Sequence, residues 1–473
     1  MSPDAGDAPP TPPPPGGAVP TAGGMRRLLG QLGPLLPLTV LSAVAAGIVG
    51  PGREYISLNY FAERYTSLGH ADIHCEFTPK AEYCEKAVND NVRVKTVLSL
   101  ISPILHLFLW PFLGAVSDAR GRYPVIMVCT VLPLLPSAAA CAFFYYDVSL
   151  YLYFALVFLT DFPAAVVWFT YVIDRVPQGE NRAAAFGILT GLAELCGLTG
   201  LIVGRSLSLS ASFTASMVLG VVQTCLIVAC LRESLPPEKR RPLGRGGLGG
   251  ALLPWRGLRI LVRDQLLARL TFVLVSAGFV DGAFTRIGPS YLLKFMEWTT
   301  HAAYTNAILG QVSIIIWLSF ALGVLTRTLG EGGVLLFGRA ACLTYGVCFA
   351  FSWEPWQVWL LTGTLAGPMA LTLPSIAALK SKLVQDDEQG MMQSALTTVN
   401  TMAGCAAAPV FGALFETWDT SDTWTPMSGA VILLGCALTV PVVVLLIRMQ
   451  AQLNGRLRGP GAGSTNQSLI SMQ

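Results

Sequence analysis

The stretch Gly114-Ala-Val-Ser-Asp118-Ala-Arg-Gly121-Arg122-Tyr-Pro124 is a short polar segment between two long apolar segments. Gly114 lets the end of the preceding segment approach a neighbouring helix closely. Asp118 can accept hydrogen bonds from the amides of a helix N-terminus or from a basic residue. Gly121 permits a tight turn because it has no Cβ to restrict the backbone. The stretch therefore predicts a turn that joins two closely packed helices.

The whole chain around this turn is apolar. Of its 473 residues, 53% are hydrophobic and 12% are charged, whereas soluble domains carry about 25% charged residues. The mean hydropathy is +0.57. These values exclude a soluble enzyme and a disordered protein, and a net charge of only +3 argues against a nucleic-acid-binding protein. The chain is predicted to be an integral membrane protein in contact with the lipid bilayer.

A membrane-spanning helix needs about 20 mostly apolar residues, and twelve stretches satisfy this requirement. They lie near residues 28–50, 94–116, 124–146, 149–172, 184–205, 208–231, 268–293, 304–326, 334–352, 356–379, 390–415 and 426–448. The expected fold is therefore an all-α membrane protein with twelve transmembrane helices.

Polar segments divide the chain into five parts. The Pro- and Gly-rich residues 1–24 and the polar residues 450–473 are predicted to be disordered cytosolic tails. A basic central loop at 232–267 separates a six-helix half at 25–231 from a second at 268–449.

The basic residues also predict the orientation. Most of the 31 lysine and arginine residues fall in the tails, the central loop and the other loops on that side. By the positive-inside rule, this distribution places both termini in the cytosol. The plasma membrane or an endolysosomal membrane is expected.

The turn at residues 114–124 resembles the G-x-x-x-D-x-x-G-R signature of the major facilitator superfamily. The resemblance implies two pseudo-repeat halves that alternate access to a central site, with Gly114, Asp118, Gly121 and Arg122 as the gating motif. The family's basic residue after the aspartate is absent here. A latch would therefore depend on Arg122 and its basic neighbour at position 120.

Further stretches resemble the tetracycline-efflux and hippocampus-abundant-transcript branch of this superfamily. They lie at residues 171–174, 233–238, 353–359 and 387–390. The proton-coupled folate transporter group is a close competitor, because it carries an acidic residue in the fifth span, as Glu194 does here.

Three acidic residues within predicted spans are candidates for proton coupling, because ionisable groups inside a bilayer are costly and usually functional. They are Asp161, Glu194 and Asp281. Each has a structural alternative. Asp161 and Glu194 could be buried partners of other residues, and Asp281 could form an ion pair between helices.

Four other polar residues are candidates for lining a substrate cavity, namely Arg286, His106, Gln311 and Asn400. Arg286 lies five residues after Asp281 and so on a different face of the helix. It could bind an anionic group or hold Asp281 ionised. His106 could instead be an ordinary core residue.

Cys75 and Cys84 lie in the acidic loop after the first span. A disulfide between them is expected, since this loop is predicted to face a non-cytosolic compartment. No metal or cofactor motif is present, and a zinc site that includes His74 is disfavoured.

The functional hypothesis is a monomeric secondary transporter that moves a small organic solute, coupled to protons. The alternatives are an uncoupled uniporter and a receptor or scaffold on the same fold. No nucleophile and base combination suggests an enzyme, no cofactor is expected, and no nucleic acid is an expected partner.

Overall fold

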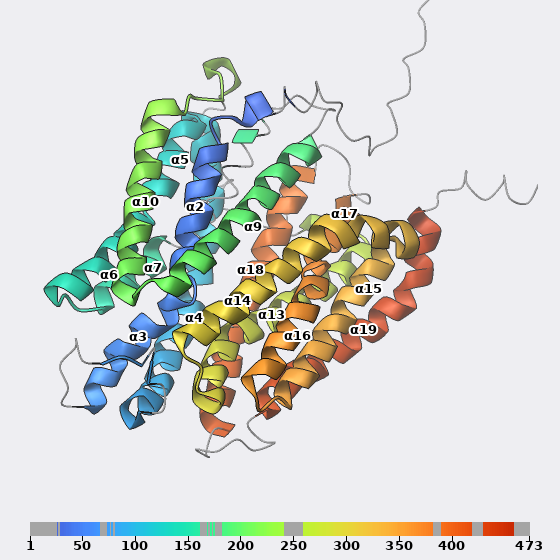
Figure 1. Ribbon diagram of the computed structural model, residues 1–473. Coiled ribbons are helices and arrows are strands. Elements are labelled where there is room, and N and C mark those ends of the chain that lie inside the picture. The colour runs from blue at the N-terminus through green and yellow to red at the C-terminus, as the bar shows by residue number, and fades with distance from the viewer. Residues whose placement is uncertain are drawn as a thin grey trace, which may run out of the picture.

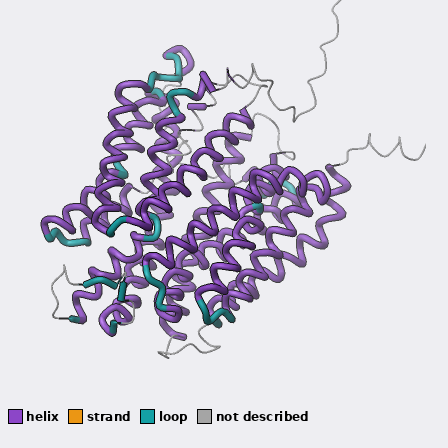
Figure 2. The backbone as a smooth tube through the Cα atoms, in the orientation of Figure 1, coloured by secondary structure: helices purple, strands orange, loops and turns teal. Residues whose placement is uncertain are grey.

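The computed structural model describes residues 26, 29–66, 73–75, 77–78, 81–160, 168, 171–172, 174–175, 182–240, 259–381, 389–418 and 429–457. Every regular element in this part of the chain is a helix (Figures 1 and 2). Nine described helices are long and apolar enough to cross a membrane. The prediction of an all-α membrane protein is confirmed at this level.

The helices follow the predicted apolar stretches. Their bounds are α2 (Leu36–Val49), α3 (Gly52–Ala62), the 3₁₀ turn η1 (Glu63–Tyr65), α4 (Glu82–Arg120), α5 (Arg122–Val131), α6 (Leu134–Tyr146), α7 (Tyr151–Thr160), α9 (Arg182–Ser206), α10 (Leu209–Cys230), the 3₁₀ turn η3 (Pro237–Lys239), α13 (Gln265–Met296), α14 (Thr300–Ile316), the π-helical turn η4 (Trp317–Ala321), α15 (Leu322–Ala350), α16 (Pro355–Ala370), α17 (Thr372–Ser381), α18 (Gln389–Trp418) and α19 (Ala430–Leu457).

Two helices extend beyond the predicted spans. α4 begins at Glu82, well before the span expected at 94–116, and α19 continues to Leu457. Composition marks the apolar part of a helix but not its polar ends, because a helix continues into water where its residues allow it.

Proline and glycine interrupt the long apolar runs. α2 ends at Gly50-Pro51 and is followed directly by α3. Pro133 separates α5 from α6. The run through α14, η4 and α15 turns at Gly330, whose φ of 72° is readily adopted by glycine.

The long helix α4 connects two ends of the molecule. We call the end with the turn at Gly121 the Gly121 end, and the end with the disulfide between Cys75 and Cys84 the disulfide end. In Figure 1, α3 and the start of α4 lie at the bottom, and the other end of α4 lies at the top.

At the disulfide end, one continuous cluster of buried apolar residues, the shared core, joins the first part of the chain to the last. It contains Ile48, Tyr55 and Phe213 from α2, α3 and α10, together with Tyr291 and Phe411 from α13 and α18. Helices far apart in the sequence are therefore packed together at this end.

At the Gly121 end, the described apolar residues form two separate clusters. The first Gly121-end core takes its residues from the first half of the chain, including Leu35, Val125 and Ile227. The second Gly121-end core takes its residues from the last half, including Leu270 and Ile376. Figure 1 shows α10 and α19 diverging toward this end.

Candidate functional site

The turn at Gly121 is built around one buried carboxylate. Gly121 has a φ of 109°, and a Cβ at this position would collide with the carboxylate of Glu233. The backbone N–H groups of Arg122 and Tyr123 donate to Glu233 Oε1 and Oε2 at 2.8 and 3.2 Å. Because the first N–H groups of a helix have no partner within it, Glu233 completes the start of α5.

The Glu233 carboxyl stays ionised in this environment. Burial raises its pKa, but the backbone N–H groups of Leu235, Arg122, Tyr123 and Ser234 donate to it and lower the pKa by more. The pKa is therefore lower than the ordinary value of 4.5. This follows from hydrogen bonds that favour the charged form.

The side chain of Arg122 joins this turn to two other segments. Its Nε donates to Asp174 Oδ2 at 2.9 Å, and its Nη1 donates to Ser117 Oγ at 3.0 Å. Ser234 Oγ also donates to Asp174 Oδ2, at 3.1 Å. We call the set of Ser117, Arg122, Asp174, Glu233 and Ser234 the turn network.

The turn network contains one of the predicted gating side chains, Arg122, beside the Gly121 backbone. The side chain of Asp118 and the surroundings of Gly114 lie outside the described residues. Sequence reasoning quoted the segment with Glu233 for its resemblance but assigned this residue no role. An acidic residue just after a long apolar helix was the available signal.

Glu194 lies midway along α9 and meets Gln311 of α14. Gln311 Nε2 donates to the Glu194 carboxylate, and it also lies 3.4 Å from the Glu194 carbonyl oxygen. No ion pair involving Glu194 is found among the described residues. Two sequence-predicted site residues, one from each half of the chain, are therefore in direct contact.

Asp281 of α13 forms an ion pair with Arg339 of α15. Arg339 Nη1 donates to Oδ1 and Oδ2 at 3.2 and 3.3 Å. Its Nη2 contacts Cys342 Sγ at 3.3 Å. The Arg339 side chain is 1% exposed, whereas that of Asp281 is 45% exposed.

The other predicted site residues are placed differently. Asn400 of α18 packs against α13, because a Cβ on Gly278 would lie 2.7 Å from Asn400 Oδ1. Asp161 and the side chains of His106 and Arg286 lie outside the described residues. The expected role of Arg286 as the partner of Asp281 therefore stays a prediction, and Arg339 is the partner that the structure places there.

Cys75 and Cys84 are joined in a disulfide with Cα atoms 5.7 Å apart. Both cysteines are buried in the shared core. The bond ties the loop after η1 to the first turn of α4.

Lys380 is a buried cation that sequence reasoning assigned to a polar loop. Its side chain is fully buried near the end of α17, and its Nζ donates to Thr271 Oγ1 of α13 at 2.5 Å. No carboxylate pairs with it among the described residues. A lysine just after a long apolar run can fold back into the protein, which composition alone does not reveal.

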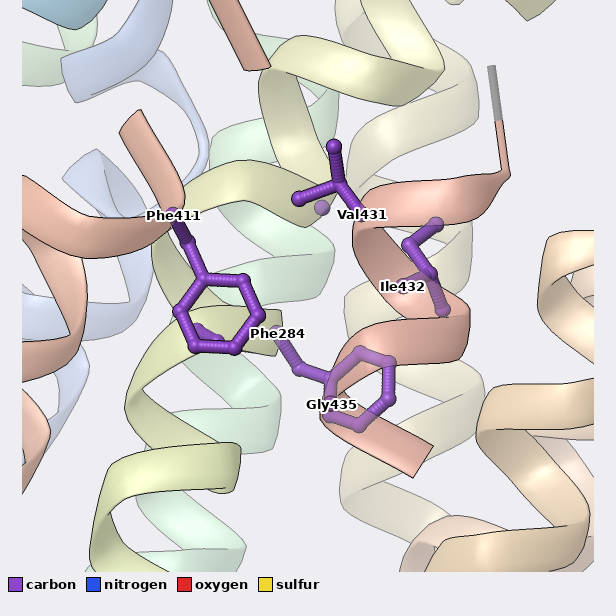
Figure 3. A pocket seen from close by; sticks show the side chains of 7 residues that line it. Phe284, Phe411, Val431, Ile432 and Gly435 are labelled. Carbon is purple, nitrogen blue, oxygen red and sulfur yellow. The ribbon is translucent and has the colours of Figure 1, made fainter. Parts of the chain in front are cut away.

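An apolar pocket of about 250 Å³ lies between α13, α18 and α19. Figure 3 shows the rings of Phe284 and Phe411 beside Val431 and Ile432. Its lining has no hydrogen-bonding side chain, so it offers no directional contact to a polar solute. No cluster of three metal-binding side chains is present among the described residues.

Comparisons with known proteins agree with this architecture. The model of the Major Facilitator Superfamily matches residues 88–409. The human Hippocampus abundant transcript 1 protein is 25% identical over 359 residues, which cover 71% of this chain and 67% of that protein. The class C Tetracycline resistance protein of Escherichia coli is 25% identical over 350 residues, which cover 72% of this chain and 85% of that protein.

Solved structures share the fold at low sequence identity. The human organic anion transporter MFSD10 has a TM-score of 0.62 at 16% identity, covering 89% of this chain and 99% of that one. The nucleoside transporter NupG has a TM-score of 0.60 at 14% identity, covering 88% of this chain and 98% of that one. The predicted resemblance is confirmed, and this membrane protein belongs to the major facilitator superfamily of transporters.

Proposed function

We propose that this transporter moves a small organic solute by alternating access, driven by protons. One observation carries the proposal. The described apolar residues form a single shared core at the disulfide end and two separate cores at the Gly121 end. This is the arrangement expected for a protein closed at one end and ready to close at the other.

The proposed layout has twelve spans in two six-helix halves. The candidate span Thr300–Ala350 contains 51 residues, about 77 Å of helix, which is enough for two crossings of a 30 Å hydrocarbon layer. Its turn at Gly330 supports this division. The long helix α4 and the short apolar helix α7 would supply the remaining two spans.

The Gly121 end is proposed to face the cytosol. Basic residues gather on the same side as the predicted central loop, and the positive-inside rule places that side inward. With this orientation, both termini are cytosolic and the described conformation is open toward the cytosol.

Among the acidic candidates, Glu194 is the proposed proton carrier. Its partner is the neutral amide of Gln311, so protonation of Glu194 leaves no buried cation unpaired. The contact joins α9 to α14, the two helices that meet between the proposed halves. A change in the charge of Glu194 would therefore act directly on the contact between these halves.

Asp281 is proposed to remain ionised as the partner of Arg339. Protonation of Asp281 would leave a fully buried guanidinium group without its counter-charge. Leaving one buried partner of such a pair uncompensated costs about 3–5 kcal/mol. The same cost makes Asp281 a poor place to add and remove a proton in each cycle.

Proton flux in liposomes tests this assignment. Purified protein is reconstituted with a trapped pH dye and challenged with pools of sugars, folates, nucleosides, amino acids, organic anions and lipophilic cations. We expect one pool to move protons with the wild type and with the control Glu63→Gln, in which the substituted side chain is exposed. Glu194→Gln should lose the proton movement while tracer solute still exchanges down its own gradient.

Other outcomes select the alternatives. Proton flux that survives in Glu194→Gln but is lost in folded Asp281→Asn would overturn the choice of Glu194. Tracer uptake without proton movement in the wild type would support a uniporter. The absence of both would support a receptor or scaffold.

A further inference from the structure

Tyr304 makes an unusually direct contact between distant parts of the chain. It lies in the first turns of α14, and its side chain is buried. The hydroxyl group donates to the carbonyl oxygen of Ile48, at the end of α2, across 2.5 Å. The two residues are separated by 256 positions in the sequence.

The break between α2 and α3 makes this carbonyl available. α2 ends at Val49, and the last carbonyl groups of a helix lack partners within it. Pro51 follows at the break and has no N–H to donate. A hydroxyl group from another helix can therefore satisfy Ile48.

Glycines on the receiving side make room for the phenol ring. A Cβ on Gly204 of α9 would lie 2.9 Å from Tyr304 Cε1, and a Cβ on Gly52 would lie 3.4 Å from the hydroxyl oxygen. The side chain of Ser212, on α10, also interacts with that hydroxyl group. We call the surface formed by Ile48, Gly52, Gly204 and Ser212 the phenol socket.

We propose that Tyr304 in the phenol socket is the latch that holds the disulfide end closed. The inference rests on the proposed alternating-access function and names the residue that controls one of its two ends. α14 lies on one side of the contact, and α2, α3, α9 and α10 lie on the other. Opening the disulfide end requires the phenol ring to leave the socket.

A second hydroxyl group crosses the same end but has no comparable socket. Tyr55 of α3 donates to the carbonyl oxygen of Trp298 at 2.9 Å. Trp298 lies in the link between α13 and α14. Tyr55 therefore holds a loop, whereas Tyr304 fixes a helix.

Hydrogen–deuterium exchange of Tyr304→Phe tests the latch. Loss of a buried hydroxyl bond should shift the balance between closed and open states roughly threefold to tenfold. Amide exchange in peptides that cover Ile48–Gly52 and the start of α14 should accelerate by a similar factor. Unchanged exchange in these peptides would overturn the proposal.

Tyr345→Phe is the matched control. Tyr345 is another largely buried tyrosine, and its hydroxyl group bonds Thr362 Oγ1 at 3.3 Å. That bond lies entirely within α15 and α16. This variant should leave exchange around Ile48 unchanged, and an equal acceleration in both variants would show a general loosening and contradict a latch.

Chemical rescue tests the socket itself. Tyr304→Ala removes the whole ring, and added p-cresol has the shape and hydroxyl group of the missing side chain. We expect p-cresol to restore slow exchange around Ile48, and toluene, which lacks the hydroxyl group, to restore less. No rescue by p-cresol, or equal rescue by toluene, would contradict a socket that recognises the hydroxyl.

The same preparations separate the two claims. If no solute pool produces flux but the exchange results are as expected, the latch stands and the transport proposal fails. If flux is normal but Tyr304→Phe exchanges like wild type, the latch fails and the transport proposal stands.

Discussion

The two ends of this transporter hold their helices together in different ways. At the disulfide end, apolar residues from early and late helices share one core, and the hydroxyl groups of Tyr55 and Tyr304 cross between them. At the Gly121 end, each set of helices has its own core. The turn network there joins segments of the first half only, through Arg122 and Glu233.

The difference shows which contacts are suited to be broken. The contacts across the disulfide end consist of uncharged hydroxyl groups and apolar side chains, which can separate without exposing an unpaired buried charge. The turn network is ionic and keeps one set of helices rigid. A moving end and a rigid unit thus use different chemistry.

The largest predicted effect comes from breaking the packing of α2 on α9, the helix that also contacts α14 at the boundary. A Cβ on Gly200 would lie 3.0 Å from the Gly47 Cα and closer still to the Val44 carbonyl. Gly200→Val should therefore cost about 3 kcal/mol or more through overpacking. Thermal unfolding followed by tryptophan fluorescence measures the loss.

Gly191→Val is the control for this change on the same helix. A Cβ on Gly191 meets nothing within 4 Å, so its melting temperature should stay close to wild type. Equal losses at the two positions would mean that the α2–α9 contact does not set the stability.

Loss of the disulfide should weaken one end selectively. Replacing Cys75 and Cys84 with alanine removes a short loop closure, which contributes roughly 2–3 kcal/mol. Proteolysis and amide exchange should increase in α3 and the start of α4 but not at the Gly121 turn. Cys225→Ala, at an exposed free cysteine, should change neither region, and a uniform loss of protection would contradict a local role.

The fold was more predictable than the site. Long apolar runs fix helices regardless of partner, and glycine at position 121 signals its turn because only glycine readily adopts a φ of 109°. Ion-pair partners depend on how helices rotate against one another. Arg339 and Arg286 both lie in predicted spans, and nothing in their spacing selects Arg339 as the partner of Asp281.

The pairing of Tyr304 with Ile48 was also beyond sequence reasoning. A backbone carbonyl leaves no mark in the sequence, and the glycines that admit the ring are scattered over α3 and α9. The contact between Glu194 and Gln311 was closer to prediction, since both residues were singled out as polar groups within spans.

Glu233→Gln tests the Gly121 end with a smaller effect. Because the pKa of Glu233 lies below 4.5 in the folded protein, its contribution is present above pH 4.5 and is lost as the pH falls through the folded-state pKa. The variant should lose about 1 kcal/mol at neutral pH. Melting curves from pH 3.5 to 7 should converge with wild type at the acidic limit.

A constant difference between Glu233→Gln and wild type across this pH range would contradict the role of the charged carboxylate. Glu238→Gln, in the nearby turn η3, provides the control. Its melting curve should match wild type throughout.

The smallest effect is predicted for Lys380 in the second Gly121-end core. Its buried amine bonds only Thr271 among the described residues, so Lys380→Met exchanges one hydrogen bond for removal of a buried charge. Stability should change by less than about 1 kcal/mol, or increase. Arg339→Met, which leaves Asp281 unpaired, should instead lower the melting temperature clearly.

A large loss in Lys380→Met would show that the second Gly121-end core needs its cation. A harmless Arg339→Met would show that the ion pair with Asp281 contributes little. Either result would change how the charges within the spans are assigned.

Distances measured at both ends in one preparation test the alternating-access account most directly. Spin labels at positions 146 and 356 report on the disulfide end, and labels at 120 and 327 report on the Gly121 end, in a background without the exposed Cys225, Cys230 and Cys348. The native residues at all four positions are exposed. We predict that lowering the pH from 8 to 5.5 in nanodiscs changes the two distances in opposite directions. Distances that stay fixed, or that lengthen together, would contradict alternating access.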